Sequence, residues 1–221
     1  MTPAAITSLH QHLLVALNPP PAEARRLFHG RGKHWPGLEQ ITVDWLQGIL
    51  LVTLFREPPD YALTALQDML SSLPYRLLLQ QRYLPDCPTQ WLAGEPVEQW
   101  QIHENGLTYL LDLGSRQNCG LFLDMRHGRQ WVKQNVAGKS VLNLFAYTCG
   151  FSVAAIAGGA RQVVNLDMSS AALGRGRENH RLNQHALSSV SFLGHDLFKS
   201  WGKLARLGPY ELIIIDPPSF Q

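Results

Sequence analysis

Hydrophobic positions at the start of the chain follow a helical pattern. Ile6, Leu9 and Leu13 recur at helical spacing, and the predicted helix ends before the three prolines at 19–21. The segment "AEARRLF" at 22–28 predicts a second, short helix after this break. The N-terminal helix, residues 1–25 in our division of the chain, therefore precedes everything else.

Strand patterns then alternate with one more helix. The segments "ITVDW" (41–45) and "ILLVTLF" (49–55) predict a hairpin, and a helix follows with Asp60 as its N-cap and Pro74 beyond its end. Next come "YRLLLQQ" (75–81) and then a second hairpin, whose two strands are joined at Asn105 and Gly106. This part of the chain, 26–124, is predicted to be a small α+β domain.

From residue 139 the pattern changes to strict alternation of strand and helix. Short apolar strands are predicted at 140–147, 162–167, 189–194 and 211–216, and helices at 150–159, 169–183 and 196–208. Such alternation is typical of an α/β domain with a Rossmann-like, doubly wound and mainly parallel sheet. We expect an incomplete sheet of four strands at 125–221, preceded by the smaller α+β domain.

Composition narrows the class of protein. The chain has 221 residues, 45% of them hydrophobic, and its 19 basic against 17 acidic residues give a formal net charge of only +2. Any polyanion must therefore be bound by local basic patches. Its three cysteines have no paired spacing, which suits a reducing cytoplasm and predicts no metal site. No signal peptide or membrane span is predicted, so we expect a soluble cytoplasmic protein.

The candidate chemistry lies at the ends of the four predicted parallel strands. Ligands of such sheets bind beyond the carboxyl ends of the strands. Gly150 opens the helix after the first strand, and Asp167, Asp196 and Asp216 follow the other three. Asp167 stands about 17 residues after Gly150, close to the offset at which an acid accepts ribose hydroxyls. Each signal has an ordinary alternative, because Gly150 could only make a turn and Asp196 could only cap a helix.

A series of motifs, taken in order, resembles one enzyme class. These are "VLNLFAYTCGFSVAA", "VVNLDMSSAAL", "ENHRLN", "HDLF" and "IIIDPPSF", with "RQNCGLFLDMR" and "GRGKHWPGLEQITVDW" upstream of them. Together they resemble the class I S-adenosylmethionine-dependent methyltransferases. More narrowly, they are similar to the bacterial branch that methylates cytosine C5 or guanine N7 of large-subunit ribosomal RNA. The resemblance extends from about residue 26 to the last residue.

The resemblance implies a cofactor site for S-adenosylmethionine. The turn that would hold its methionine part, together with the next residue, is Phe145, Tyr147, Thr148, Gly150 and Phe151. Asp167 would take the ribose hydroxyls, Met168 would lie against the adenine, and Asp196 with Leu197 would read the adenine edge. The residue pattern agrees, because no G-x-G-x-x-G phosphate cradle for a nicotinamide dinucleotide follows the first strand.

The resemblance places the catalytic end of the site at the last strand. Asp216 and Pro217 would face both the reactive methyl and the target base, with Asp216 also counted among the cofactor-binding residues. Phe220 could stack on the base or be a core contact. Sheets of this class continue beyond their fourth strand, so the chain resembles a C-terminally truncated form. The nucleophile, if the chemistry needs one, is expected beyond the chain end.

Two cysteines depart from the pattern of the branch. Cys149 stands where a second glycine or serine is common, and Cys119 where threonine is common. Free cysteine usually behaves as a small buried hydrophobe, so neither is predicted to be a nucleophile. The target atom thus stays open between C5 of cytosine, which needs a thiolate on C6, and a ring nitrogen of guanine, which needs only positioning.

The implied macromolecular partner is RNA, in particular ribosomal RNA, and the oligomeric state stays open. Three basic clusters could follow its backbone, at 25–33, at 126–133 and at 175–181. The first is favoured because His29, His34 and Trp35 could stack on unpaired bases, although Trp35 could equally be core.

We therefore expect a methyltransferase of a base in ribosomal RNA, inactive as this chain alone. The alternative is a module that binds cofactor or RNA without turnover. Asp167→Ala is expected to weaken cofactor binding without altering the fold.

Overall fold

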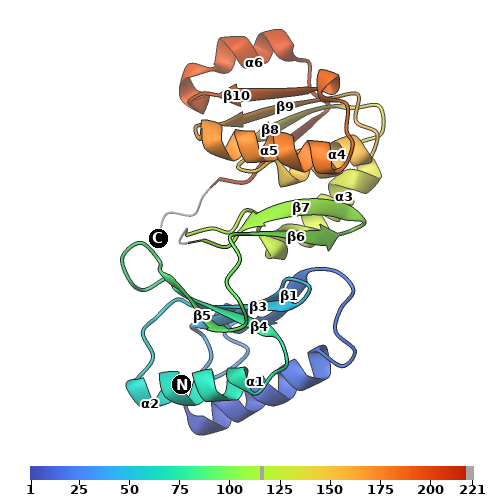
Figure 1. Ribbon diagram of the computed structural model, residues 1–221. Coiled ribbons are helices and arrows are strands. Elements are labelled where there is room, and N and C mark those ends of the chain that lie inside the picture. Colours follow the sequence, from blue (N-terminus) through green and yellow to red (C-terminus); the bar gives the residue numbers. More distant parts are fainter. Residues whose placement is uncertain (115–116, 218–221) are drawn as a thin grey trace. The chain divides into compact units, whose positions relative to one another are not determined.

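The computed structural model describes residues 1–114 and 117–217. They form two compact units. The N-terminal unit comprises residues 1–103 and 111–119, and the C-terminal unit comprises residues 104–110 and everything from residue 120 (Figure 1).

The N-terminal unit is a five-stranded sheet with two helices on one face. The sheet order is β1-β2-β3-β4-β5, and all neighbouring strands are antiparallel except β3 and β4, which are parallel. The strands are β1 (Arg25–His29), β2 (Ile41–Trp45), β3 (Ile49–Leu54), β4 (Arg76–Gln81) and β5 (Thr89–Ala93). The helices are α1 (Pro3–Ala16) and α2 (Asp60–Ser71), which lie on the same side of this sheet in Figure 1.

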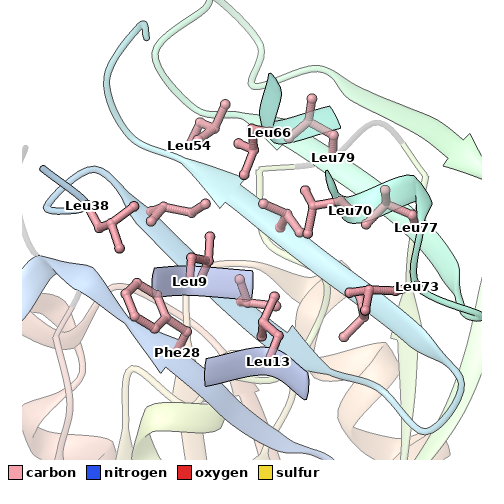
Figure 2. Close-up of a cluster of buried hydrophobic side chains, with 14 of the residues drawn as sticks. Leu9, Leu13, Phe28, Leu38, Leu54, Leu66, Leu70, Leu73, Leu77 and Leu79 are labelled. Atoms are coloured by element: carbon pink, nitrogen blue, oxygen red, sulfur yellow. The ribbon is translucent and has the colours of Figure 1, made fainter. Parts of the chain in front are cut away.

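The core of this unit lies between the two helices and the sheet. Leu9 and Leu13 of α1 and Leu66 and Leu70 of α2 are almost completely buried (Figure 2). They pack against strand residues of the same face, among them Phe28, Leu54, Leu77 and Leu79. The predicted helices at the N-terminus and after residue 60 are confirmed, except that Pro59, not Asp60, is the N-cap of α2.

The short helix predicted at 22–28 is wrong. This segment contains strand β1, which pairs with β2. Phe28 enters the core, and Arg26 forms two hydrogen bonds with Asp44 of β2, at 2.8 and 3.1 Å. Cross-strand pairing and burial therefore outweigh the local helical tendency of this segment. Strand β5 was not predicted either.

The second predicted hairpin is confirmed. Its strands are β6 (Gln99–Glu104) and β7 (Leu107–Asp112), which form a two-stranded sheet. Asn105 and Gly106 have φ angles of 53° and 72°, the left-handed conformation that a two-residue hairpin turn of this type requires. The hairpin contributes residues 104–110 to the C-terminal unit.

The C-terminal unit contains a four-stranded parallel sheet in the order β10-β9-β8-β11. The strands are β8 (Ser140–Leu144), β9 (Gln162–Asp167), β10 (Val190–Gly194) and β11 (Leu212–Ile215). The helices are α3 (Arg126–Asn135), α4 (Gly150–Ala157), α5 (Ser170–Leu182) and α6 (Trp201–Leu207). This arrangement confirms the predicted fold class, while α3 was not predicted.

Helices cover both faces of this sheet. On one face Val141, Val163 and Ile214 pack with residues of α3 and α4. On the other face Leu142, Val164 and Leu193 pack with Leu204 of α6. Figure 1 shows α6 on one side of the strands and α4 and α5 on the other. In neither described range is a helix both long and apolar enough to cross a membrane.

Candidate functional site

The carboxyl ends of the four parallel strands lie at one edge of the sheet. Gly194 of β10 is in register with Asp167 of β9, and Ile215 of β11 with Leu144 of β8. The structure therefore brings the segments after these strands to the same edge, which is the usual ligand-binding edge of such sheets.

The loop that joins β8 to α4, residues 145–149, has a strained backbone. Phe145, Tyr147 and Cys149 have φ angles of 55°, 45° and 61°, although none of them is glycine. Such conformations cost about 1–3 kcal/mol each and persist where surrounding contacts hold them, often at ligand sites. We call this segment the β8–α4 loop.

Asp167 holds the β8–α4 loop from the end of β9. Its Oδ2 accepts a hydrogen bond from the Tyr147 backbone N–H at 2.8 Å, and its Oδ1 accepts one from the Ser169 N–H at 2.8 Å. The carboxylate therefore also organises the protein backbone, which the sequence did not reveal. Each carboxylate oxygen keeps a lone pair for a further donor.

Thr148 and Cys149 are fixed inside the protein. The Thr148 hydroxyl donates to the carbonyl oxygen of Gly120, and Cys149 is completely buried. Burial, followed by the nearby Asp167 carboxylate, raises the pKa of the Cys149 thiol well above its usual range. A thiol in this setting is a poor nucleophile, which agrees with its interpretation as a buried hydrophobe.

Gly150 begins helix α4 and approaches other side chains closely. A Cβ atom at this position would lie 2.9 Å from a methyl carbon of Leu121 and 3.5 Å from Cδ of Arg129. Phe151, the next residue, is half-buried and packs against the core beneath α4. The close approach of Leu121 thus favours glycine at position 150.

The adenine-binding candidates lie at the ends of β9 and β10. Met168 is 76% exposed directly after Asp167. Asp196 caps a short 3₁₀ helix (Leu197–Lys199), because its Oδ1 accepts from the Phe198 N–H at 2.8 Å. Asp196 thus has the capping role that the sequence left open, and its second carboxylate oxygen has no described partner among residues 1–114 and 117–217.

Asp216 and Pro217 follow the end of β11. Burial and then the Asp124 carboxylate raise the pKa of Asp216, and Arg129 partly offsets this rise. Two carboxylates and one guanidinium therefore share this part of the unit. The remaining residues of the predicted motif, including Phe220, lie outside the described residues.

Several residues that support the β8–α4 loop and the start of α4 were missed in the sequence. Arg129 of α3 makes two hydrogen bonds to Glu104, at 2.6 and 2.8 Å, and both side chains are buried. The buried Tyr109 donates its hydroxyl to the Gly150 carbonyl at 3.4 Å, and the Phe122 ring lies 5.5 Å from that of Tyr147. These partners are distant in sequence, so no local motif signals them.

A chain of hydrogen-bonded polar side chains runs through the C-terminal unit, and all of its members except the half-buried His185 are buried. Asn143 donates to Asn165, which donates to Ser152, each at 2.9 Å. Ser152 is hydrogen-bonded to His180 at 2.9 Å, and His180 to His185 at 3.1 Å. Burial and the neighbouring His185 lower the pKa of His180 to about 3, so the ring is neutral at physiological pH.

Three arginines of the predicted RNA-binding clusters have defined partners. In the first cluster Arg26 pairs with Asp44, while the guanidinium of Arg31 lies 4.2 Å from the centre of the Phe55 ring. Trp35 is only partly buried and packs against the core. Arg177 of the third cluster lies over Phe192, at 4.5 Å from the ring centre.

Comparison with known proteins gives consistent matches. A family model described as S-adenosylmethionine-dependent methyltransferase matches residues 25–221. The "Ribosomal RNA large subunit methyltransferase I" of Serratia proteamaculans (strain 568) is 33% identical over 207 residues, which cover 88% of this chain and 51% of the relative. The protein of the same name from Aeromonas salmonicida (strain A449) is 40% identical over 131 residues, 58% of this chain and 33% of the relative.

The solved structures agree in fold. The crystal structure of SMU.776 in complex with SAH (S-adenosylhomocysteine) aligns with a TM-score of 0.86 at 26% identity, covering 99% of this chain and 58% of that chain. The chain spans about half the length of the curated relative that it matches over most of its own residues. The family model covers far more than half of the chain, and the motif resemblance is confirmed at this level. This match, together with the strand order and the loop after β8, shows that the chain belongs to the S-adenosylmethionine-dependent methyltransferase family.

Proposed function

We propose that the chain binds S-adenosylmethionine at the carboxyl edge of β8–β11 and serves methyl transfer to a base of large-subunit ribosomal RNA. The observation that carries this proposal is the Asp167 carboxylate at the end of β9, which also holds the strained β8–α4 loop. The names of the Serratia and Aeromonas relatives support the RNA class.

The side chains at this edge fit a cationic nucleoside. Asp167 has acceptor capacity left for two ribose hydroxyls, and the exposed Met168 offers an apolar surface to an adenine ring. Burial and, after it, the Asp124 carboxylate raise the pKa of Asp216, and a sulfonium or ammonium group nearby would favour the charged carboxylate again. In this proposal Phe145, Thr148 and Gly150 hold the methionine part, with Phe151 beside them, and Asp196 with Leu197 meets the adenine edge.

S-adenosylmethionine supplies an electrophilic methyl group when it is bound. The role of this chain is to hold the cofactor and, through Asp216 and Pro217, to orient the base towards the methyl. The target atom is C5 of cytosine or a ring nitrogen of guanine. The first requires a thiolate, which the buried Cys149 does not provide.

RNA contact is assigned to the central α+β domain, residues 26–124, with Arg25 at its border. Arg25 and Lys33 are exposed, and Arg31 is stacked on Phe55, an arrangement that leaves its guanidinium edge able to meet a phosphate. Arg26 contributes less, because Asp44 neutralises it. The methyltransferase domain, in this division of the chain, is 125–221.

The cofactor part of the proposal is tested by calorimetry on the 221-residue chain with S-adenosylhomocysteine, and with NAD as the control ligand. We expect saturable binding of S-adenosylhomocysteine and none of NAD. Binding of NAD alone, or of neither ligand, would contradict the assignment.

The transfer part is tested with S-adenosylmethionine carrying a tritiated methyl group and unmodified large-subunit ribosomal RNA. Incorporation into RNA supports methyl transfer, and digestion to nucleosides identifies the base. Cofactor binding without any incorporation would favour the alternative, a module that binds without turnover as this chain alone.

A further inference from the structure

The strained β8–α4 loop needs several outside contacts to keep its conformation. Tyr147 is held by Asp167, and the Thr148 hydroxyl is held by Gly120. A further contact is to the Thr148 carbonyl, which accepts a hydrogen bond from Nδ2 of Asn179 at 3.0 Å. Asn179 lies on α5 and is completely buried.

The amide oxygen of Asn179 is also hydrogen-bonded. Its Oδ1 accepts a hydrogen bond from the Leu110 backbone N–H of β7 at 2.9 Å. One amide group therefore links the β8–α4 loop to the hairpin strand. The amide supplies both the donor and the acceptor that this link needs, whereas an ionised aspartate of the same size could only accept.

Asn183, one helical turn later, extends the same arrangement without touching the loop. Its Oδ1 accepts from the Thr108 N–H at 2.9 Å, and its Nδ2 donates to the Thr108 carbonyl at 2.7 Å. Thr108 and Leu110 are two residues apart on β7, about 6.6 Å, and Asn179 and Asn183 are four apart on α5, about 6 Å. The two asparagines thus form hydrogen bonds with backbone groups of β7 that a neighbouring strand would otherwise form.

We propose that Asn179 is a positioning residue for cofactor binding, which couples the order of the β8–α4 loop to the order of the β7 edge. The proposal rests on the proposed cofactor site. Cofactor that holds the loop in its strained conformation also strengthens the Asn179 link, so the Leu110 N–H becomes better protected. Conversely, loss of the link leaves the Thr148 carbonyl without its donor and weakens cofactor binding.

Two matched substitutions distinguish a positioning role of Asn179 from a purely stabilising one. Asn179→Asp keeps an acceptor for the Leu110 N–H but places a carboxylate oxygen against the Thr148 carbonyl. Asn183→Asp makes the same chemical change one turn away, against the backbone carbonyls of Thr108 and Asn179. We expect Asn179→Asp to weaken S-adenosylhomocysteine binding by about 10-fold to 100-fold and Asn183→Asp to change it by less than about twofold.

Amide hydrogen exchange supplies the readout that a merely structural role would not move. S-adenosylhomocysteine should slow exchange of the Leu110 amide in the unaltered chain and in Asn183→Asp, but not in Asn179→Asp. Equal affinity in all three proteins, or equal weakening in both variants, would overturn the positioning role. If Asn179→Asp does not fold, an unchanged Leu110 exchange rate in the unaltered chain on ligand addition overturns it too. If the unaltered chain does not bind S-adenosylhomocysteine, the proposed cofactor site itself is contradicted. This outcome differs from a failure of the positioning role, in which the unaltered chain still binds.

Discussion

At the scale of single residues, Asp167 has a structural role that its sequence position does not signal. Its position after a parallel strand predicts a ligand role, while the structure shows that it accepts the Tyr147 and Ser169 backbone N–H groups. The expectation that Asp167→Ala leaves the fold untouched is therefore revised. Removing a charged acceptor from two N–H groups affects the protein even without ligand.

Asp167→Ala should lower S-adenosylhomocysteine affinity by about 100-fold and the free energy of unfolding by about 1–3 kcal/mol. Calorimetry and urea unfolding measure the two effects. Glu211→Ala is a matched control, because Glu211 accepts the Ser140 N–H at the opposite edge of the same sheet. Unchanged affinity in Asp167→Ala, or an equal loss in the control, would show that the cofactor does not bind at the end of β9.

Two glycines of α5 provide a second residue-scale comparison. A Cβ atom at Gly176 would overlap the Cys149 sulfur and lie 2.9 Å from the Cys149 Cβ, whereas nothing lies within 4 Å of a Cβ at Gly174. Gly176→Ala should therefore destabilise the protein by about 1–3 kcal/mol. Gly174→Ala should stabilise it by about 0.5–1 kcal/mol, because alanine favours the helix. Thermal unfolding of both variants checks this. A Gly176→Ala variant as stable as the unaltered chain would contradict the close contact between α5 and Cys149.

At the scale of elements, the parallel sheet of the C-terminal unit could be predicted from the sequence, whereas helix α3 and strand β1 could not. Four short apolar strands alternating with helices specify a parallel sheet, and parallel strands necessarily bring Asp167 and Asp216 to one edge. Helix α3 was missed because its buried face carries Arg129, whose charge is neutralised by Glu104, a partner 25 positions away. Strand β1 was mistaken for a helix because its pairing with β2 is not visible locally.

The two histidines of α5 and its C-terminal turn predict a pH dependence of stability. The pKa of His180 is about 3 in the folded protein and about 6.5 when unfolded, and the pKa of His185 is also lowered by burial. Between these values the unfolded chain binds more protons. The stabilising effect of a neutral His180 is therefore fully present above pH 6.5 and is lost progressively as the pH falls towards 3.

Urea unfolding at about pH 7.5 and 5.5 tests this. His180→Gln should reduce the pH-dependent loss of unfolding free energy by about 1 kcal/mol between these values. The same substitution at the exposed His127 of α3 is the control and should leave the loss unchanged. An identical pH dependence in the unaltered chain and in His180→Gln would contradict a buried neutral ring.

At the scale of the whole molecule, each of the two units has its own hydrophobic core. A ligand that binds only the C-terminal unit should stabilise only that unit. At a concentration 100 times its dissociation constant, S-adenosylhomocysteine should slow the slowest-exchanging amides of β8 and β9 by about 100-fold and leave those of β3 and β4 unchanged. Equal slowing in both sheets would show that the two units unfold as one.

The buried Cys149 makes the opening of the β8–α4 loop measurable. Its sulfur lies beneath the strained backbone and against α5, and burial keeps it in the unreactive protonated form. A thiol reagent can therefore reach this atom only in the fraction of molecules whose loop has opened. The labelling rate of one natural side chain reports how often the loop between β8 and α4 leaves its held conformation, with no probe attached beforehand.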